Sequence, residues 1–317
     1  MTATPVATST QPELRREPKK KGSRRSLAKL IRMIPLVPAI ILMTIFLAGP
    51  IIWSLYGSFT NTALTGRAAT DPQWIGLDNY TQLFADPLFP QAVWLTVLFT
   101  LASAVIAQTI LGLGLALIMT RANKSISTVV GTIIVAAWIL PEIVAAFVAY
   151  AFFSQDGTLN QILAVFGFDG PNWLFSFPMI AVILANIWRG AAFSMMIYQA
   201  ALNDVPPEIT EAAMIDGASG AKRLFYVTLP MIKQTITTTL MLITLQTLSL
   251  FTLIFVMTGG GPGNDSTTLP IFAFKEAFRF GNIGYGTAIA TVMLAVGAVF
   301  SIIYIRALRS PKEEEVK

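Results

Sequence analysis

Six long, almost uncharged apolar segments constrain this chain more than any other feature. About twenty apolar residues are enough for a helix to cross the hydrocarbon core of a bilayer. The composition agrees, with 54% apolar and 12% charged residues among 317. We therefore predict an all-α integral membrane protein with six transmembrane helices, some long enough to tilt. The predicted spans are 33–57, 92–120, 127–153, 178–202, 235–257 and 287–308.

The basic residues predict the orientation of these spans. Of the 22 Lys and Arg residues, eighteen fall in the tails and loops on one side of the predicted membrane. Only Arg67, Lys275 and Arg279 fall on the other side, and Arg189 lies within a span. Because cytoplasmic segments accumulate positive charge, we expect both termini in the cytoplasm of a multi-pass cell-membrane protein.

The same interpretation divides the chain into five parts. They are a basic cytoplasmic tail (1–32), the first transmembrane helix (33–57), an external loop (58–91), a core of five transmembrane helices (92–308) and a short cytoplasmic tail (309–317). The basic tail suits contact with anionic lipid headgroups, the alternative being a nucleic-acid arm. We expect the first helix to be a retained anchor, because it lacks a convincing small-residue cleavage site.

The missing residue types exclude several kinds of chemistry. Without Cys or His, the chain has no disulfide, no thiolate or histidine catalysis and no zinc site of the usual kind. The glycine-rich run 258–265 lacks the Gly-Lys-Ser/Thr ending of a phosphate-binding loop, so we expect an external turn there. We expect no metal, no cofactor and no enzymatic activity on this chain.

The cytoplasmic segment 203–234 carries its own helix signals. Pro206 and Pro207 suit a helix start, and Gly217 suits the C-terminal cap of that helix. Ser219 can cap a second short helix, which we expect Pro230 to end. Such a loop favours a docking element for a protein partner, the alternative being an amphipathic helix on the lipid surface.

Residues 92–308 carry an ordered series of motifs. They are Leu140-Pro141, Gly157-Thr158-Leu159-Asn160, Asn186-Ile187-Trp188-Arg189-Gly190, Glu211-Ala212-Ala213 with Asp216-Gly217 and Leu229-Pro230, and Thr258-Gly259-Gly260-Gly261-Pro262. In this order the motifs resemble the permease domain of ABC importers in the carbohydrate-uptake branch, in which the fourth motif is called the EAA loop. The chain is similar to the shorter, six-span form of the first of the two permeases in a sugar system. The EAA-loop residues to which the resemblance assigns ATPase coupling are Glu211, Ala212, Ala213, Asp216, Gly217, Leu229 and Pro230.

In that family two different permeases form the pore, two ATPase subunits bind ATP and Mg²⁺, and an external binding protein delivers the solute. The resemblance therefore implies these partners here, and a solute that is a mono-, di- or oligosaccharide or resembles glycerol phosphate. The alternative is a self-contained secondary transporter or channel, although such carriers usually show an internal repeat and more membrane-buried carboxylates. A membrane enzyme is a third class, disfavoured by the missing His and Cys.

Polar residues within two spans suggest a solute path. Asn186, Arg189, Gly190 and Phe193 follow each other at offsets of 0, 3, 4 and 7, which places them on one helical stripe. Gln246 and Ser249 add polar groups in the fifth predicted span. The alternative is ordinary polar packing between membrane helices. The resemblance to sugar permeases favours the path.

Two ionisable residues fall well within predicted spans, and their depths suggest an ion pair. Glu142 and Arg189 each lie roughly 20 Å from the inner boundary at about 1.5 Å per residue. Either charge alone costs on the order of 3 kcal/mol near the bilayer centre, so pairing or contact with water is required. One hypothesis is a buried Glu142–Arg189 pair, toward which a kink at Pro141 would turn Glu142. The competing hypothesis is separate contacts of the two residues to pore water or to the sibling permease.

Overall fold

The computed structural model describes residues 34–308, and this part is helical with no β-strand. The all-α prediction is therefore confirmed. The chain forms two compact units, which divide between Trp53 and Ser54. Four helices in the described part are long and apolar enough to cross a membrane, and a bent pair of helices adds a fifth candidate.

The first candidate span is Val37–Gly57, a helix of 21 residues. It follows a 3₁₀ turn, η1 (Ile34–Leu36), and contains α2 (Val37–Met43), the π-helical segment η2 (Thr44–Ala48) and α3 (Gly49–Gly57). The predicted basic tail, 1–32, lies outside the described residues, as does the tail 309–317.

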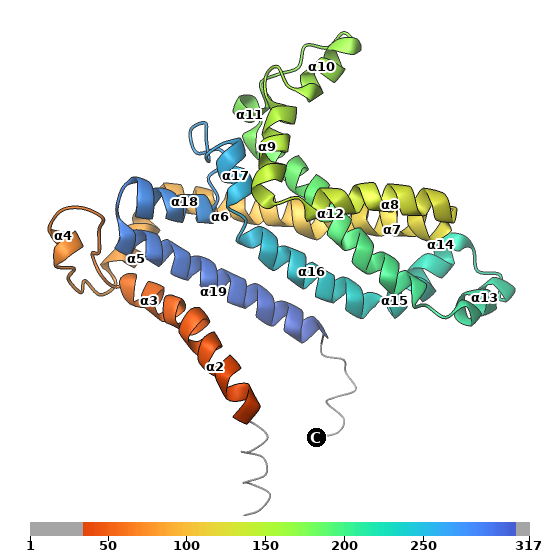
Figure 1. Cartoon of the computed structure of the whole chain (residues 1–317), viewed down its shortest axis with the longest axis horizontal. Helices are drawn as coiled ribbons and strands as arrows, with labels where there is room; N and C mark the ends of the chain where they lie inside the picture. The colour runs from red at the N-terminus through yellow and green to blue at the C-terminus, as the bar shows by residue number, and fades with distance from the viewer. Residues whose placement is uncertain (1–33, 309–317) are drawn as a thin grey trace, which may run out of the picture. The chain divides into compact units, whose positions relative to one another are not determined.

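Three long helices of the second unit correspond to predicted spans two, four and six (Figure 1). Span two comprises α6 (Leu88–Phe99), the π-helical η3 (Thr100–Gln108) and α7 (Thr109–Arg121). Span four is α12 (Pro178–Asn203), and span six is α19 (Ile283–Leu308). Within their most apolar windows, 44% of α12 is buried but only 11% of α19, so α12 is the more enclosed helix.

Small residues let α7 and α12 approach closely. A Cβ atom added to Gly112 would lie 2.4 Å from the Cβ of Ser194, and Ala191 and Ala192 are buried on the same helix as Ser194. Membrane helices gain little from the hydrophobic effect between them, so such close backbone packing is a main source of association. It fixes α12 against span two.

The third predicted span is not one straight helix. α8 (Lys124–Ile139) and α9 (Glu142–Phe153) are separated at Leu140-Pro141, and the two arms are bent by 105°. Pro141 has no N–H to donate, and its ring disfavours helical backbone at Leu140, which is extended with ψ 133°. α9 then packs against α17, more than a hundred residues later (Figure 1).

The fifth predicted span also ends early. α16 (Lys233–Leu248) has 16 residues, and a non-helical break separates it from α17 (Thr252–Met257). The predicted single helix 235–257 is therefore two helices, and α16 is too short to count among the spanning candidates of the described part.

Short helices form most of the loops predicted to be external. In chain order they are α4 (Arg67–Thr70), α5 (Asp78–Ala85), α10 (Thr158–Val165), α11 (Trp173–Ser176), α18 (Leu269–Phe274) and the π-helical η5 (Lys275–Arg279).

The glycine-rich segment 258–267, which precedes α18, is a tight turn, as predicted. Gly259, Gly260 and Asn264 have positive φ. Lys275 Nζ donates to Asn264 Oδ1 and to Thr267 Oγ1, and both hydrogen bonds are 3.0 Å long. Burial lowers the pKa of Lys275, and Arg279 lowers it further.

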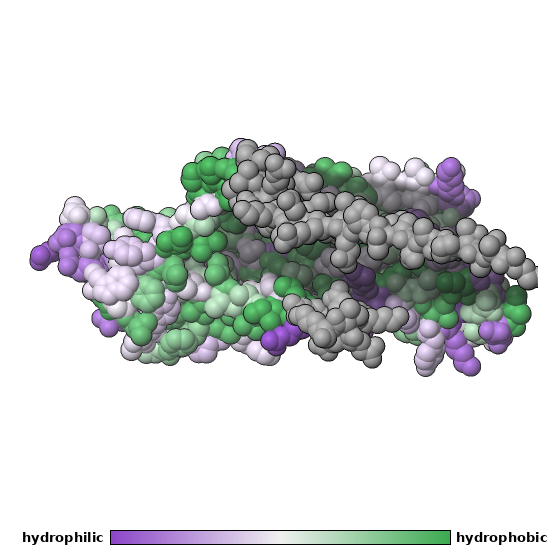
Figure 2. Space-filling view, turned by 90° about the horizontal axis from the view of Figure 1, so that it is seen from below, coloured by the Kyte–Doolittle hydropathy of each residue, from purple (hydrophilic) through white to green (hydrophobic). Residues whose placement is uncertain are grey.

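The surface is unusually apolar for a folded chain. Large side chains such as Trp188, Val299 and Ile303 stand exposed on α12 and α19. Seen from one side, hydrophobic residues dominate the middle and most hydrophilic residues gather toward the ends (Figure 2). Lipid or partner subunits must cover such a surface.

Candidate functional site

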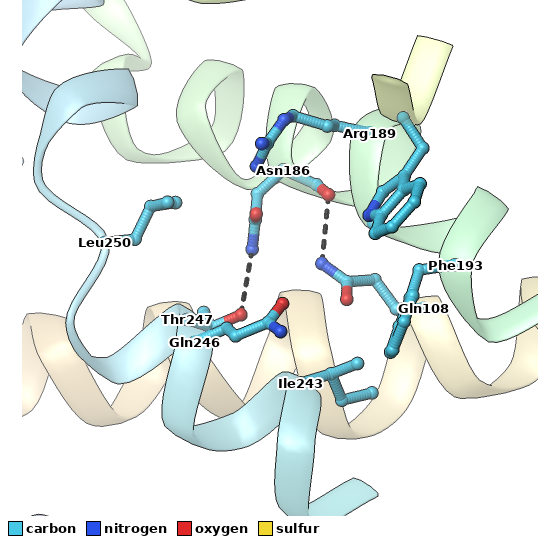
Figure 3. A pocket seen from close by; sticks show the side chains of 10 residues that line it. Gln108, Asn186, Arg189, Phe193, Ile243, Gln246, Thr247 and Leu250 are labelled. Atoms are coloured by element: carbon cyan, nitrogen blue, oxygen red, sulfur yellow. Dashed lines mark hydrogen bonds between the residues drawn. The ribbon is translucent and has the colours of Figure 1, made fainter. Parts of the chain in front are cut away.

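A pocket between α12 and α16 brings together most of the residues predicted to form the solute path (Figure 3). Its cavity volume is about 30 Å³, and about 350 Å³ when the open space at its mouth is included. Asn186, Arg189, Gly190, Phe193 and Gln246 line it, as the spacing predicted, whereas Ser249 does not. The remaining lining residues are Gln108, Trp138, Ile243, Thr247 and Leu250.

Asn186 anchors the floor of the pocket. Its side-chain nitrogen donates to Ser103 Oγ over 2.8 Å and to Thr247 Oγ1 over 3.4 Å. The residue is only 4% exposed, so these bonds satisfy an amide that would be costly to bury unpaired. Asn186 therefore connects three segments, η3, α12 and α16, and acts here as a structural residue of the pocket.

Gln108 is the lining residue that sequence reasoning missed most clearly. Its Nε2 donates to the carbonyl oxygen of Asn186 over 2.9 Å, so its side chain lies across α12. Gly190 makes this possible, because a Cβ there would lie 2.3 Å from Gln108 Cδ. The signal was available, since Gln108 is the only amide in the predicted span 92–120.

Two aromatic rings form one wall. Phe193 of α12 and Trp138 of α8 are stacked, with ring centroids 5.4 Å apart and an interplanar angle of 25°. Phe193 was predicted as a flat surface for a sugar ring, but the contribution of Trp138 from another helix was not predicted. The pocket therefore combines amides and a hydroxyl with an aromatic face and one cation.

Ser249 lies outside this wall for a local reason. It is the C-cap residue that follows the last helical residue of α16. Its hydroxyl donates to the carbonyl oxygens of Leu245 and Gln246, at 3.2 Å in both cases. The expected stripe continues only while the helix does, so the break after Leu248 removes Ser249 from the pocket.

Arg189 has no ion-pair partner among residues 34–308. Its Nε is buried without a hydrogen-bond partner, and the predicted pair with Glu142 is absent from this chain. The predicted depth of Glu142 used a constant rise per residue along the third span, and the bend at Pro141 is much sharper than the kink that was expected there. Glu142 instead begins α9 just beyond the bend at Pro141, so its distance from the start of α8 no longer gives its depth.

The cytoplasmic loop has the helix ends that the sequence predicted. α13 (Pro207–Ile215) begins after Pro206, and Gly217 has φ +78°. Gly217 N donates to Met214 O and Ala218 N donates to Ala213 O, and both hydrogen bonds are 3.0 Å long. These two bonds define a Schellman cap, in which the positive φ favours glycine. Ser219 Oγ accepts from Lys222 N over 3.4 Å and caps the next helix.

Pro230 does not end that second helix. α14 (Gly220–Arg223), the π-helical η4 (Leu224–Thr228) and α15 (Leu229–Met231) run on continuously through Leu229 and Pro230. Pro230 is at the start of α15, after a wider turn in which Leu229 N donates to Leu224 O. Pro230 has no N–H to donate, so the helix continues past it with one backbone hydrogen bond fewer.

The surface of this loop is exposed. Glu211, Ala212 and Asp216 face solvent, and Ala213 is half-buried. Large apolar side chains stand beside them, with Ile215 87% exposed and Tyr226 80% exposed. Several exposed apolar side chains within one short, capped loop are typical of a surface that contacts another protein.

Comparison with known proteins identifies the class. Residues 108–310 match the family model described as "Binding-protein-dependent transport system inner membrane component". The chain belongs to this family. It is a multi-pass membrane subunit of a binding-protein-dependent transport system, and it is a transport subunit and not an enzyme. Membership decides against the self-contained carrier.

Individual relatives match a larger part of the chain than the family model does. The chain is 34% identical to the sulfoquinovosyl glycerol transport system permease protein of Agrobacterium fabrum, over 89% of this chain and 91% of the relative. It is 31% identical to the trehalose transport system permease protein of Mycobacterium tuberculosis, over 90% of each chain.

A solved structure shows the same fold. A chain of a bacterial alginate ABC transporter, crystallised with an alginate-bound periplasmic protein, aligns with a TM-score of 0.77. The alignment covers 92% of this chain and 99% of that chain at 21% identity.

Proposed function

We propose that this chain forms half of the pore of an ATP-driven importer for sugars or sugar derivatives. A second, different permease supplies the other half, two ATPase subunits bind ATP and Mg²⁺, and an external binding protein delivers the solute. The observation that carries the proposal is the family match, which spans both the polar pocket and the cytoplasmic loop. The names of the relatives support a sugar as the solute class.

The loop of α13 to α15 is the ATPase docking site in this proposal. Glu211, Ala212, Ala213, Asp216, Gly217, Leu229 and Pro230 belong to it, and its exposed apolar residues include Ile215 and Tyr226. The cap at Gly217 fixes the direction in which the chain leaves α13. A rigid corner of this kind can transmit movement between an ATPase and the spans, because a flexible one would absorb it.

The pocket is the membrane segment of the solute path. The amides of Gln108 and Gln246 and the hydroxyl of Thr247 suit the hydroxyl groups of a sugar, and the Trp138–Phe193 wall suits its apolar face. With the loop in the cytoplasm, both termini are cytoplasmic as well, in agreement with the distribution of Lys and Arg.

The decisive experiment changes the backbone of the loop without creating a clash. A Cβ at Gly217 meets no atom within 4 Å, so Gly217→Val acts only through its unfavourable positive φ. Such strain costs about 1–3 kcal/mol. In cells that express the complete importer, we expect Gly217→Val to abolish most solute uptake at normal membrane abundance. Gly217→Asn, which tolerates this conformation, should retain most of it.

The chain contains a matched control for this experiment. Gly167 follows α10 with φ +79°, also lacks neighbours around its Cβ position, and closes the same type of cap through Ala164 and Leu163. Gly167→Val introduces equal backbone strain far from the loop in sequence, and uptake should persist. Full uptake by Gly217→Val, or equal loss in both variants, would refute docking at this loop.

A further inference from the structure

We infer that the pocket between α12 and α16 binds a glycoside that carries a negative charge, such as a carboxylate, sulfonate or phosphate, with Arg189 as the residue that recognises the charge. The inference rests on the proposed function and adds the substrate class to it.

The first observation is that Arg189 has no negatively charged group beside it in the pocket. Arg189 lies in the middle of α12 and is half-buried, and its Nε has neither solvent contact nor a hydrogen-bond partner. No carboxylate lines the pocket, and no ion pair of Arg189 occurs among residues 34–308. A guanidinium keeps its charge under all physiological conditions. Only the Nε edge of this cation is buried, and the pocket offers no carboxylate to its terminal nitrogens.

The second observation is the set of polar side chains that share the pocket with Arg189. Gln108 and Gln246 line the same pocket, Gln246 from the facing helix α16 (Figure 3). A guanidinium offers parallel N–H groups that match the oxygens of a carboxylate or phosphate. An anion placed in this pocket would meet the terminal nitrogens of the guanidinium, which are not buried, whereas Nε has no surface that a ligand can reach.

The remaining lining residues suit the rest of a sugar molecule. Gln108 uses its Nε2 on Asn186 O. The side chain of Gln246 has no hydrogen-bond partner in the described part of the chain, so it is free to contact hydroxyl groups. The stacked rings of Trp138 and Phe193 provide the flat apolar surface. The lining therefore offers contacts to a ring, to hydroxyl groups and to one anionic group. In this chain by itself the cavity of about 30 Å³ admits only part of such a ligand.

The test is direct binding to the purified importer in nanodiscs, without its binding protein. The probes are pairs that differ in charge and share a ring: methyl glucoside with methyl glucuronide, and methyl galactoside with methyl galacturonide. Inorganic sulfate is a third arm, which separates recognition of a charged sugar from recognition of any anion. Calorimetry gives the dissociation constants.

We expect at least one uronide to bind wild-type importer about tenfold or more tightly than its neutral partner, as charge-assisted hydrogen bonds imply. Arg189→Gln should remove this preference, and Arg189→Lys should keep part of it. Arg279→Gln, which removes an exposed cation outside the spans, should leave it unchanged.

Three results would overturn the inference. They are equal binding of charged and neutral probes to wild-type importer, sulfate binding as tight as that of the uronides, and an unchanged preference in Arg189→Gln. If Arg189→Gln fails to assemble, the wild-type comparison alone decides. A complex that assembles and imports solute without preferring anions refutes the anionic class and leaves the proposed function intact.

Discussion

Gly190 matters because of the side chain it lacks. Its missing Cβ leaves room for the Gln108 amide, which crosses α12 to reach Asn186 O. Gly190→Ala should destabilise the assembled importer by about 1–3 kcal/mol, the usual range for overpacking, and reduce uptake. Thermal unfolding of the purified complex measures the loss.

A double-mutant cycle separates the clash from other effects of the methyl group. Gln108→Ala alone should cost about 1 kcal/mol through its lost hydrogen bond. Adding Gly190→Ala to Gln108→Ala should then cost little more, because the atoms that clash are gone. Strictly additive losses would show that Gly190 serves a different purpose.

Lys275 holds the outer glycine turn closed. Its Nζ donates to Asn264 and Thr267, and Asn264 is held at φ +74°. Lys275→Met should therefore loosen residues 258–267 and speed amide hydrogen exchange there about tenfold, as expected for the loss of one or two bonds. Arg279→Met, an exposed cation in the same helical segment, is the control and should leave exchange unchanged.

At the residue scale, the sequence predicted those pocket residues that share one helix. Asn186, Arg189, Gly190 and Phe193 follow from helical spacing alone. Gln108 and Trp138 come from two other helices, and a single sequence contains no information on how helices rotate against each other. The same gap produced the Glu142–Arg189 pair, because depth in the membrane does not determine direction.

The break at Leu140-Pro141 sets the direction of a whole element. It bends Glu142–Val165, which includes α9, by 105° from α8 and allows α9 to pack against α17. Pro141→Ala restores an N–H and permits a continuous helix, so we expect reduced uptake at normal abundance. Pro141→Gly still disfavours helix and should retain more uptake than Pro141→Ala. Equal activities of the two variants would show that proline is not what maintains the bend.

Helix ends divide into those that sequence predicts and those that it does not. The cap at Gly217 and the cap at Ser219 depend on a few adjacent residues, so local rules predicted both. Pro230 and the end of α16 depend on π-helical turns and on packing, and the same rules were wrong there. Length and hydropathy predicted that spans three and five exist but not that they are broken.

For the molecule as a whole, the exposed surface of the chain indicates that other molecules cover it. Apolar side chains stay exposed on α12 and α19, a cation in the pocket lacks a counterion, and the cytoplasmic loop presents Ile215 and Tyr226 to solvent. Lipid covers part of such a surface. The loop lies outside the predicted spans, and the proposed function assigns its exposed surface to a protein partner.

Copurification tests this account most directly. The chain would be tagged and isolated from cells that express the whole importer, and then compared with the chain expressed alone. We predict that a second permease and an ATPase are retained with the tagged chain. ATP hydrolysis and solute accumulation in liposomes should occur only with this assembly. Solute accumulation by the lone chain, driven by an ion gradient and without ATP, would contradict the account.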